Sequence, residues 1–246
     1  MTVAPSGVIP AIPTPFTPDG ASVDEAALRS VVRHVVDGGV HAIMTTGGTG
    51  EFPHLSREDR RRVTEVVVSE TAERALRLLG VTEGTTLFID GGAGGVGSAA
   101  TQLAKVRGAM VIASASEANQ GYLREIGAIP VVYGEGMVER VKALQIGKVD
   151  AVLDAVGKTP IDDLISLTTE PSQVVSIANF GAAASGARVT GGGPDSQPMK
   201  ALAEAAELLE QSKLVIKIQT FPFDRAAEAY QISQDGHVRG KLVLVP

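Results

Sequence analysis

The stretch Thr85-Thr86-Leu87-Phe88-Ile89-Asp90-Gly91-Gly92-Ala93-Gly94-Gly95-Val96-Gly97 decides the fold of most of this chain. Its first residues have the apolar and β-branched character of a buried strand, and a helix is predicted to follow over residues 97–107. Between them, the glycines have the spacing G-x-G-x-x-G. A second strand is predicted at residues 110–114. Together, the strand, glycine turn, helix and second strand indicate a dinucleotide site at the edge of a parallel sheet.

Each glycine of the turn has a separate role in that prediction. Gly92 permits the tight turn, Gly94 lets a pyrophosphate approach the backbone, and Gly97 lets the helix pack closely on the strand. The helix N-terminus adds N–H donors and the positive end of a dipole. We therefore predict cofactor contacts from the whole turn, which comprises Gly92, Ala93, Gly94, Gly95, Val96 and Gly97.

The end of the second strand predicts which dinucleotide binds. An acidic residue about 20 residues beyond the first glycines accepts a hydrogen bond from the ribose 2′-OH of NAD. This chain has Ser114-Ala115-Ser116 there, and Ser114, Ser116 and Asn119 could donate hydrogen bonds to a 2′-phosphate. We therefore predict NADP as the cofactor. Glu117 lies just beyond and could reach the ribose, so NAD stays an alternative.

The alternation of strands and helices continues on both sides of this unit. It predicts an α/β protein with a doubly wound, parallel, Rossmann-type sheet. The predicted strands span residues 8–12, 41–45, 85–89, 110–114, 130–133, 151–154, 173–177, 214–219 and 241–245. The predicted helices span residues 24–36, 57–79, 97–107, 119–126, 135–144, 199–211 and 225–233. Asp24 and Ser56 are placed where helix N-caps belong.

The composition excludes several classes of function. The 246 residues include 22 Lys and Arg against 28 Asp and Glu, a net charge of −6, which argues against nucleic acid as a partner. No apolar run reaches the length of about 18 residues that a membrane span needs, so we expect no membrane partner and a cytoplasmic protein. Cysteine is absent, which rules out disulfides and cysteine-based metal sites. No metal site is expected.

Residue usage changes near residue 71. All eight lysines lie at or after Lys105, and all three tyrosines lie at or after Tyr122. The first part instead carries the loop Thr46-Gly47-Gly48-Thr49-Gly50-Glu51-Phe52 after the strand predicted at residues 41–45. Backbone N–H groups and the Thr49 hydroxyl of such a loop could bind a carboxylate or a phosphate. The alternative, and the more common case, is a tight turn whose glycines adopt positive φ.

This first part resembles the dihydrodipicolinate synthase and N-acetylneuraminate lyase superfamily, including its ketodeoxyglucarate dehydratase branch. The resemblance implies that Gly48 and Thr49 hold the carboxylate of a keto acid. It also implies an eight-stranded TIM barrel whose reaction uses a Schiff-base lysine and a tyrosine. Residues 1–71 cover only a βαβα fragment, about two of the eight units, and contain no lysine or tyrosine. The resemblance makes a Schiff-base carbon–carbon lyase or dehydratase acting on a keto acid an alternative function, and the missing lysine counts against it.

Residues 72–246 resemble the C-terminal part of a zinc-free quinone oxidoreductase of the medium-chain dehydrogenase/reductase family. The resemblance implies an oxidoreductase that transfers hydride between NADP(H) and a quinone or enone. It places the pyrophosphate on the glycine turn and the adenosine ribose near Ser114, Ser116 and Asn119. The further cofactor contacts that it implies come from Asp154, Val156, Ile177, Asn179, Phe180 and Lys241. Lys241 ends the segment Arg239-Gly240-Lys241, which resembles the family's closing cofactor-contact motif. It also places residues 191–193 near the sheet edge through which family members dimerise.

Only the last pieces of that family's separate catalytic domain are recognised, within residues 214–246. We interpret the chain as chimera-like, with a barrel fragment at residues 1–71 joined to a dinucleotide-binding unit at residues 72–246. Activity is expected to be weak or lost, and an inactive chimeric scaffold is a further alternative. A quarter of a barrel would expose apolar residues such as Val8, Ile12, Ile43 and Met44. We therefore expect a homo-oligomer.

Overall fold

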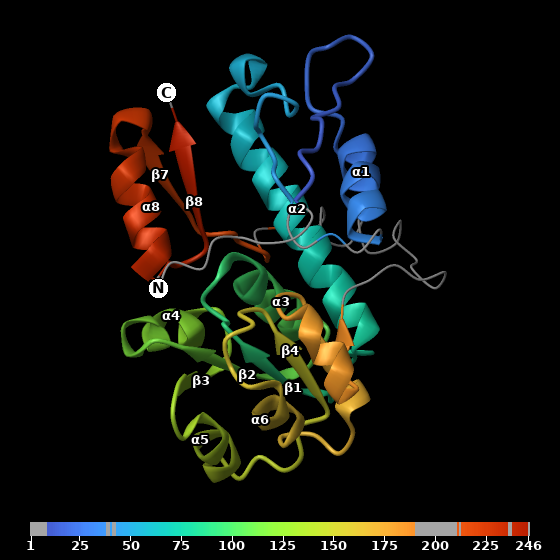
Figure 1. Ribbon diagram of the computed structural model, residues 1–246, viewed down its shortest axis with the longest axis vertical. Coiled ribbons are helices and arrows are strands. Elements are labelled where there is room, and N and C mark those ends of the chain that lie inside the picture. The colour runs from blue at the N-terminus through green and yellow to red at the C-terminus, as the bar shows by residue number, and fades with distance from the viewer. Residues whose placement is uncertain are drawn as a thin grey trace.

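The computed structural model describes residues 9–37, 40, 43–189, 211, 213–235 and 238–245. Their centre is a six-stranded sheet with the strand order β3-β2-β1-β4-β5-β6, in which all pairs are parallel (Figure 1). An order that runs outward from β1 in both directions is that of a doubly wound sheet, so the predicted fold class is confirmed. The strands are β1 (Thr86–Asp90), β2 (Met110–Ala115), β3 (Ile129–Val132), β4 (Ala151–Asp154), β5 (Val174–Ser176) and β6 (Arg188–Val189).

Both faces of the sheet are buried, because successive side chains along each strand alternate between two cores. Leu87 and Ile89 of β1 pack into the core that α2, α3 and α4 complete. Phe88 packs into the opposite core with α5 and α6. These helices are α2 (Arg57–Leu78), α3 (Gly95–Val106), α4 (Gln120–Glu125), α5 (Met137–Ala143) and α6 (Ile161–Ile165). Neither α6 nor β6 was predicted from the sequence.

Helix α2 belongs to both parts of the chain. It begins with a capping box, in which Ser56 Oγ accepts from the backbone N–H of Asp59 at 3.1 Å and Ser56 N donates to the Asp59 carboxylate at 3.0 Å. Val66, in its first half, packs in the core of the first part. Leu76, in its second half, packs in the core of the six-stranded sheet. The boundary predicted at residue 71 therefore lies inside one continuous helix (Figure 1).

In the first part, the two predicted strands are reduced to one parallel bridge between Ala11 and Met44. Ile12 N donates to Met44 O at 3.0 Å. Ile12 is 2 % exposed, contrary to our expectation, because α1 (Glu25–Asp37) and α2 cover it. Ile43 also packs partly against this core, whereas Met44 is 53 % exposed, as expected. Val8 lies outside the described residues.

The C-terminal part forms a separate parallel pair of strands, β7 (Ile218–Pro222) and β8 (Lys241–Val245), with α8 (Ala226–Asp235) between them in sequence. The pair lies beside the first half of α2, where Arg57 Nη2 donates to Thr220 Oγ1 at 2.8 Å (Figure 1). Most of the helix predicted at residues 199–211, and the whole loop at residues 191–193, lie outside the described residues. No described helix is long and apolar enough to cross a membrane.

Candidate dinucleotide-binding site

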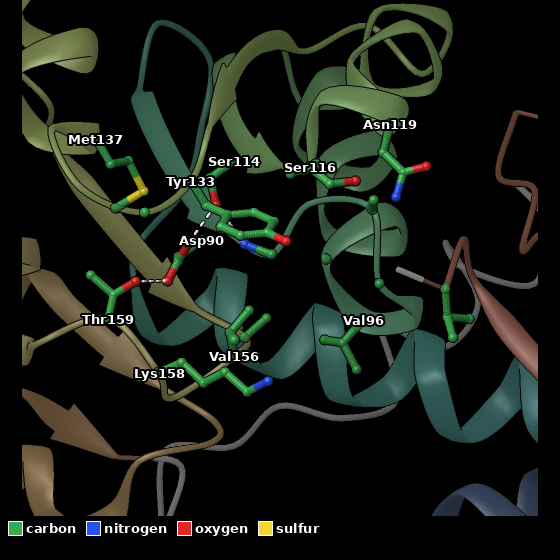
Figure 2. Close-up of a pocket in the computed structure, with 18 of the residues that line it drawn as sticks. Asp90, Val96, Ser114, Ser116, Asn119, Tyr133, Met137, Val156, Lys158 and Thr159 are labelled. Carbon is green, nitrogen blue, oxygen red and sulfur yellow. Dashed lines mark hydrogen bonds between the residues drawn. The ribbon is translucent and has the colours of Figure 1, made fainter. Parts of the chain in front are cut away.

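A pocket of about 1160 Å³ opens at the carboxyl ends of β1, β2 and β4 (Figure 2). This is the edge of an open parallel sheet at which ligands bind, beside the point where the strand order reverses. The glycine turn forms one wall, and the loops after the strands and the start of β8 form the others. Ten of the predicted cofactor residues line it, namely Ala93, Gly94, Gly95, Val96, Gly97, Ser114, Ser116, Asn119, Val156 and Lys241.

The positions of the turn differ in whether packing within the protein requires glycine there. A Cβ on Gly92 would lie 2.5 Å from the Cβ of Ala113, and one on Gly97 would lie 2.2 Å from Gly91 O, so packing within the protein requires both glycines. A Cβ on Gly94 would meet only Gly91 O, at an ordinary contact distance of 3.4 Å. Gly94 is also the N-cap of α3 and makes no side-chain cap, although Ser or Asp would stabilise the helix there. The protein therefore has no packing need for glycine at position 94.

Lys241 adds a positive charge beside this turn. Its side chain lies over Gly95, where a Cβ would come within 2.5 Å of Lys241 Cε. Burial lowers the pKa of the Lys241 ammonium, and no carboxylate among the described residues forms an ion pair with it. A half-buried ammonium at the N-terminus of α3 favours an anionic ligand. The backbone of Gly240 fixes this arrangement by donating to Ala93 O at 2.9 Å.

Asp90 places a buried carboxylate in the same pocket. Thr159 Oγ1 donates to its Oδ2 at 2.7 Å, and Ser114 Oγ donates to its Oδ1 (Figure 2). Burial raises the pKa of Asp90, and the two hydroxyl hydrogen bonds oppose that shift. Ser114 is itself fully buried, and its Oγ also accepts from Gly91 N at 3.0 Å. The Ser114 hydroxyl is therefore already hydrogen-bonded to Asp90 and Gly91. Of the three donors that we expected for a 2′-phosphate, Ser116 and Asn119 remain.

The loop after β2 carries those two residues. The Ser116 hydroxyl has no hydrogen-bond partner within the described part of the chain. Asn119 is 4 % exposed, and its Oδ1 accepts from Arg239 Nε at 2.5 Å. Glu117 points away from the interior as an exposed residue. In Figure 2, Ser116 and Asn119 lie side by side at the rim of the pocket.

Other predicted residues lie behind the pocket wall or far from it. Asp154 is fully buried and accepts from the backbone N–H groups of Val156 and Gly157, at 3.0 and 2.7 Å, so it shapes the loop after β4. Ile177 packs against the core, and Asn179 occupies the N-cap position of the 3₁₀ turn Phe180–Ser185 without a side-chain capping hydrogen bond. The side chain of Phe180 lies outside what the structure describes.

The loop of the first part is separate from the pocket. Gly48 and Thr49 are exposed and line no wall of it. Gly50 is required by the turn itself, since a Cβ there would lie 2.7 Å from Thr46 N. Among the described residues, no group of three or more His, Cys, Asp or Glu is arranged to hold a metal ion.

Besides Asp90, sequence analysis missed pocket residues in the loops that follow β3 and β4. Tyr133 and Met137 follow β3, and Lys158 and Thr159 follow β4 (Figure 2). Their position in the sequence could have predicted them, because residues that directly follow neighbouring parallel strands meet at the same edge of the sheet.

Two protein-family models match successive parts of the chain. Residues 4–86 match the model of the dihydrodipicolinate synthetase family, and residues 126–244 match that of the zinc-binding dehydrogenases. The chain resembles two families in succession. The 4-hydroxy-tetrahydrodipicolinate synthase of Methanopyrus kandleri is 47 % identical over 64 residues, which are 26 % of this chain and 21 % of that protein. The enzyme of the same name from Salinibacter ruber is 38 % identical over 74 residues, 30 % of this chain and 24 % of the relative.

The chain also resembles solved structures of oxidoreductases. A quinone oxidoreductase from Coxiella burnetii is 31 % identical and superposes with a TM-score of 0.57, covering 73 % of this chain and 58 % of that chain. A probable oxidoreductase from Mycobacterium abscessus is 27 % identical and superposes with a TM-score of 0.62. The match covers 79 % of this chain and 64 % of the Mycobacterium abscessus chain. The chain thus spans about a quarter of these curated relatives and about three fifths of these solved structures.

Proposed function

We propose that this chain binds NADP(H) in the pocket at the edge of the six-stranded sheet. The observation that carries the proposal is Gly94, which packing within the protein does not require and where a Cβ would occupy the approach to the helix N-terminus. The half-buried ammonium of Lys241 beside it, which pairs with no carboxylate among the described residues, supports an anionic ligand such as a diphosphate. Ser116 and Asn119 at the rim support a 2′-phosphate over the free 2′-hydroxyl of NAD.

We further propose that residues 72–246 are a quinone-oxidoreductase-like unit. The bound nicotinamide would supply hydride transfer to a small molecule such as a quinone or enone. The chain's own residues hold the diphosphate at the glycine turn and line the pocket at Val156. Residues that precede this unit match another family, so we expect weak or no turnover. The division into units at residues 1–71 and 72–246 is part of this proposal.

The alternative of a lyase or dehydratase rests on the match over residues 4–86. That segment has the loop with Gly48 and Thr49 but no lysine to form a Schiff base with a keto acid. The NADP(H) proposal is favoured because its pocket and its charged groups are assembled in one place.

Titration of cofactor fluorescence with Gly94→Ala tests the proposal. A methyl group there would obstruct the diphosphate, so we expect NADPH affinity to fall by about tenfold or more. The thermal midpoint should stay unchanged, because the new Cβ meets no protein atom closer than 3.4 Å.

Gly97→Ala is the matched control, because its Cβ would lie 2.2 Å from Gly91 O and must disturb the turn. In this variant, loss of binding should be accompanied by a lower thermal midpoint. Unchanged NADPH affinity in a folded Gly94→Ala protein would contradict the proposal.

A further inference from the structure

A glutamine in α3 holds a backbone segment from the far end of the chain. Gln102 Nε2 donates to Val215 O at 2.9 Å, and Val215 N donates to Gln102 Oε1 at 2.8 Å. Val215 is 113 residues away in sequence and belongs to none of the described strands. The side-chain amide therefore pairs with the Val215 backbone in the way that a neighbouring strand would.

The Gln102 side chain is itself held in place. It is 8 % exposed, and its Nε2 also donates to Ser98 O, one turn earlier in α3, at 3.0 Å. On either side of Val215, Leu214 and Ile216 are buried in the core to which α3 contributes. The segment that leads into β7 is thus fixed to α3 by its backbone and by its side chains.

This segment also fixes the start of β8. Lys241 N donates to Lys217 O at 2.9 Å, two residues after Val215. The Lys241 side chain in turn lies over Gly95, at the beginning of α3. Gly95 and Gln102 are seven residues apart, so they lie on the same face of α3, about two turns from each other. The contacts therefore form a closed ring that begins and ends on one helix.

We infer that Gln102 is a positioning residue for the cofactor site, which fixes the start of β8 so that the Lys241 ammonium stays at the N-terminus of α3. The inference rests on the proposed function and adds to it a residue that does not itself line the pocket. A lysine has a flexible four-carbon stem, so the place of its backbone decides which groups its ammonium can reach. Gln102 would therefore act on the cofactor through Lys241.

NADPH titration of Gln102→Met tests the inference. Methionine is about as long as glutamine but has no N–H donor and only a weak acceptor, so the Val215 backbone loses its partner. We expect NADPH affinity to fall about fivefold to thirtyfold. Gln173→Met is the matched control, because the Gln173 amide oxygen accepts from the backbone N–H groups of Thr169 and Glu170, directly before β5 and outside the pocket. The control should change NADPH affinity by less than about twofold.

A double-mutant cycle tests whether Gln102 acts through Lys241. If it does, adding Gln102→Met to Lys241→Met should lower NADPH affinity by less than about a further twofold. In Gln102→Met, the pKa of the Lys241 ammonium should rise toward its ordinary value, because a displaced side chain is less buried. NMR of the chain with isotope-labelled, dimethylated lysines measures that pKa, and the Lys241→Met spectrum assigns the signal. An equal effect of Gln102→Met with and without the Lys241 ammonium would overturn the inference.

A measurement on the unmodified chain does not depend on how the variants fold. If the hydrogen bonds between Gln102 and Val215 position Lys241 for the cofactor, the bound cofactor must by linkage stabilise those hydrogen bonds. Saturating NADPH should therefore slow hydrogen exchange of the Val215 amide by about fivefold or more and leave that of the Thr169 amide unchanged. Unchanged exchange at Val215 with NADPH bound would overturn the inference while leaving the dinucleotide site in place. If the unmodified chain did not bind NADPH, the proposed function would fail, and the inference with it.

Discussion

Asp90 ends the central strand with a carboxylate that is only 2 % exposed. Its two hydroxyl partners, Ser114 and Thr159, come from the neighbouring strand β2 and from the loop after β4. Burial dominates, so the pKa of Asp90 in the folded protein lies above its ordinary value. A raised carboxyl pKa stabilises the folded state at low pH, and this stabilisation is lost as the pH rises through the folded-state pKa.

Asp90→Asn should therefore change the pH dependence of stability. Asparagine cannot ionise, and it can keep hydrogen bonds to both hydroxyls. Relative to the unmodified chain, the variant should gain stability as the pH is raised from below 4 toward 8. Urea unfolding at a series of pH values measures this difference.

Ser114→Ala keeps the Asp90 carboxylate and removes one of its two hydroxyl partners. It removes the donor that stabilises the ionised Asp90, so we expect a loss of about 1.5 to 3 kcal/mol at neutral pH. A stability difference between Asp90→Asn and the unmodified chain that is constant over the whole pH range would contradict this account of Asp90.

The residues of the site were predictable to different degrees. The glycine turn was predicted because its backbone constraints are local, and three glycines express them within six positions. The partners of Ser114 could not be predicted, since they depend on which strands become neighbours. The contact between Arg239 and Asn119 could not be predicted either, since only the folded chain brings these two residues together.

Among the elements, α2 is the one that joins the two parts. Glu70 faces α1, where Arg33 Nε lies 3.6 Å from its carboxylate, and Glu73 three residues later pairs with Arg107 beyond the end of α3. The apolar residues divide in the same manner, with Val66 in the core of the first part and Leu76 in the core of the sheet. A single helix therefore packs against two unrelated partners along its length.

Substitutions in the two halves of α2 should have different consequences. Leu76→Ala should destabilise the sheet by about 2 to 5 kcal/mol and weaken NADPH binding, because it leaves a cavity beneath the nucleotide-binding unit. Val66→Ala should destabilise the first part and leave NADPH affinity within about twofold of the original. Denaturant unfolding and cofactor titration of both variants measure this. Equal effects on NADPH binding would show that the two cores form one cooperative unit.

Two elements were predicted with nearly their observed bounds. The helix predicted at residues 57–79 is observed as Arg57–Leu78, and the strand predicted at residues 151–154 as Ala151–Asp154. Short elements such as α6 and β6, of five and two residues, carry too few positions for a pattern to be recognised. The first two predicted strands form only a bridge, which is consistent with a sheet that lacks the neighbouring strands of a barrel.

At the scale of the whole molecule, the first part leaves apolar surface uncovered. Met44 is 53 % exposed at the bridge to Ala11, and both open edges of such a strand pair can template association. We therefore predict that the 25.4 kDa chain forms dimers or larger species at micromolar concentration. Met44→Lys should shift it toward monomer in size-exclusion chromatography with light scattering.

Met110→Lys is the matched control for that experiment, because Met110 is 42 % exposed at the start of β2, in the other part of the chain. It should leave the assembly unchanged. A monomeric unmodified chain would refute the predicted association through the first part.

The anchoring of Arg239 on Asn119 has a consequence for how the protein acquires its pocket. The unit β1-α3-β2 is local in sequence and can form early, whereas the Arg239 contact must close a loop of 120 residues. Loop closure over such a distance costs entropy before the contacts that it makes can offset it. During refolding from urea, far-UV circular dichroism should therefore recover before the fluorescence of bound NADPH. For that interval the chain would have its helices and sheet while the rim that holds the cofactor is still open.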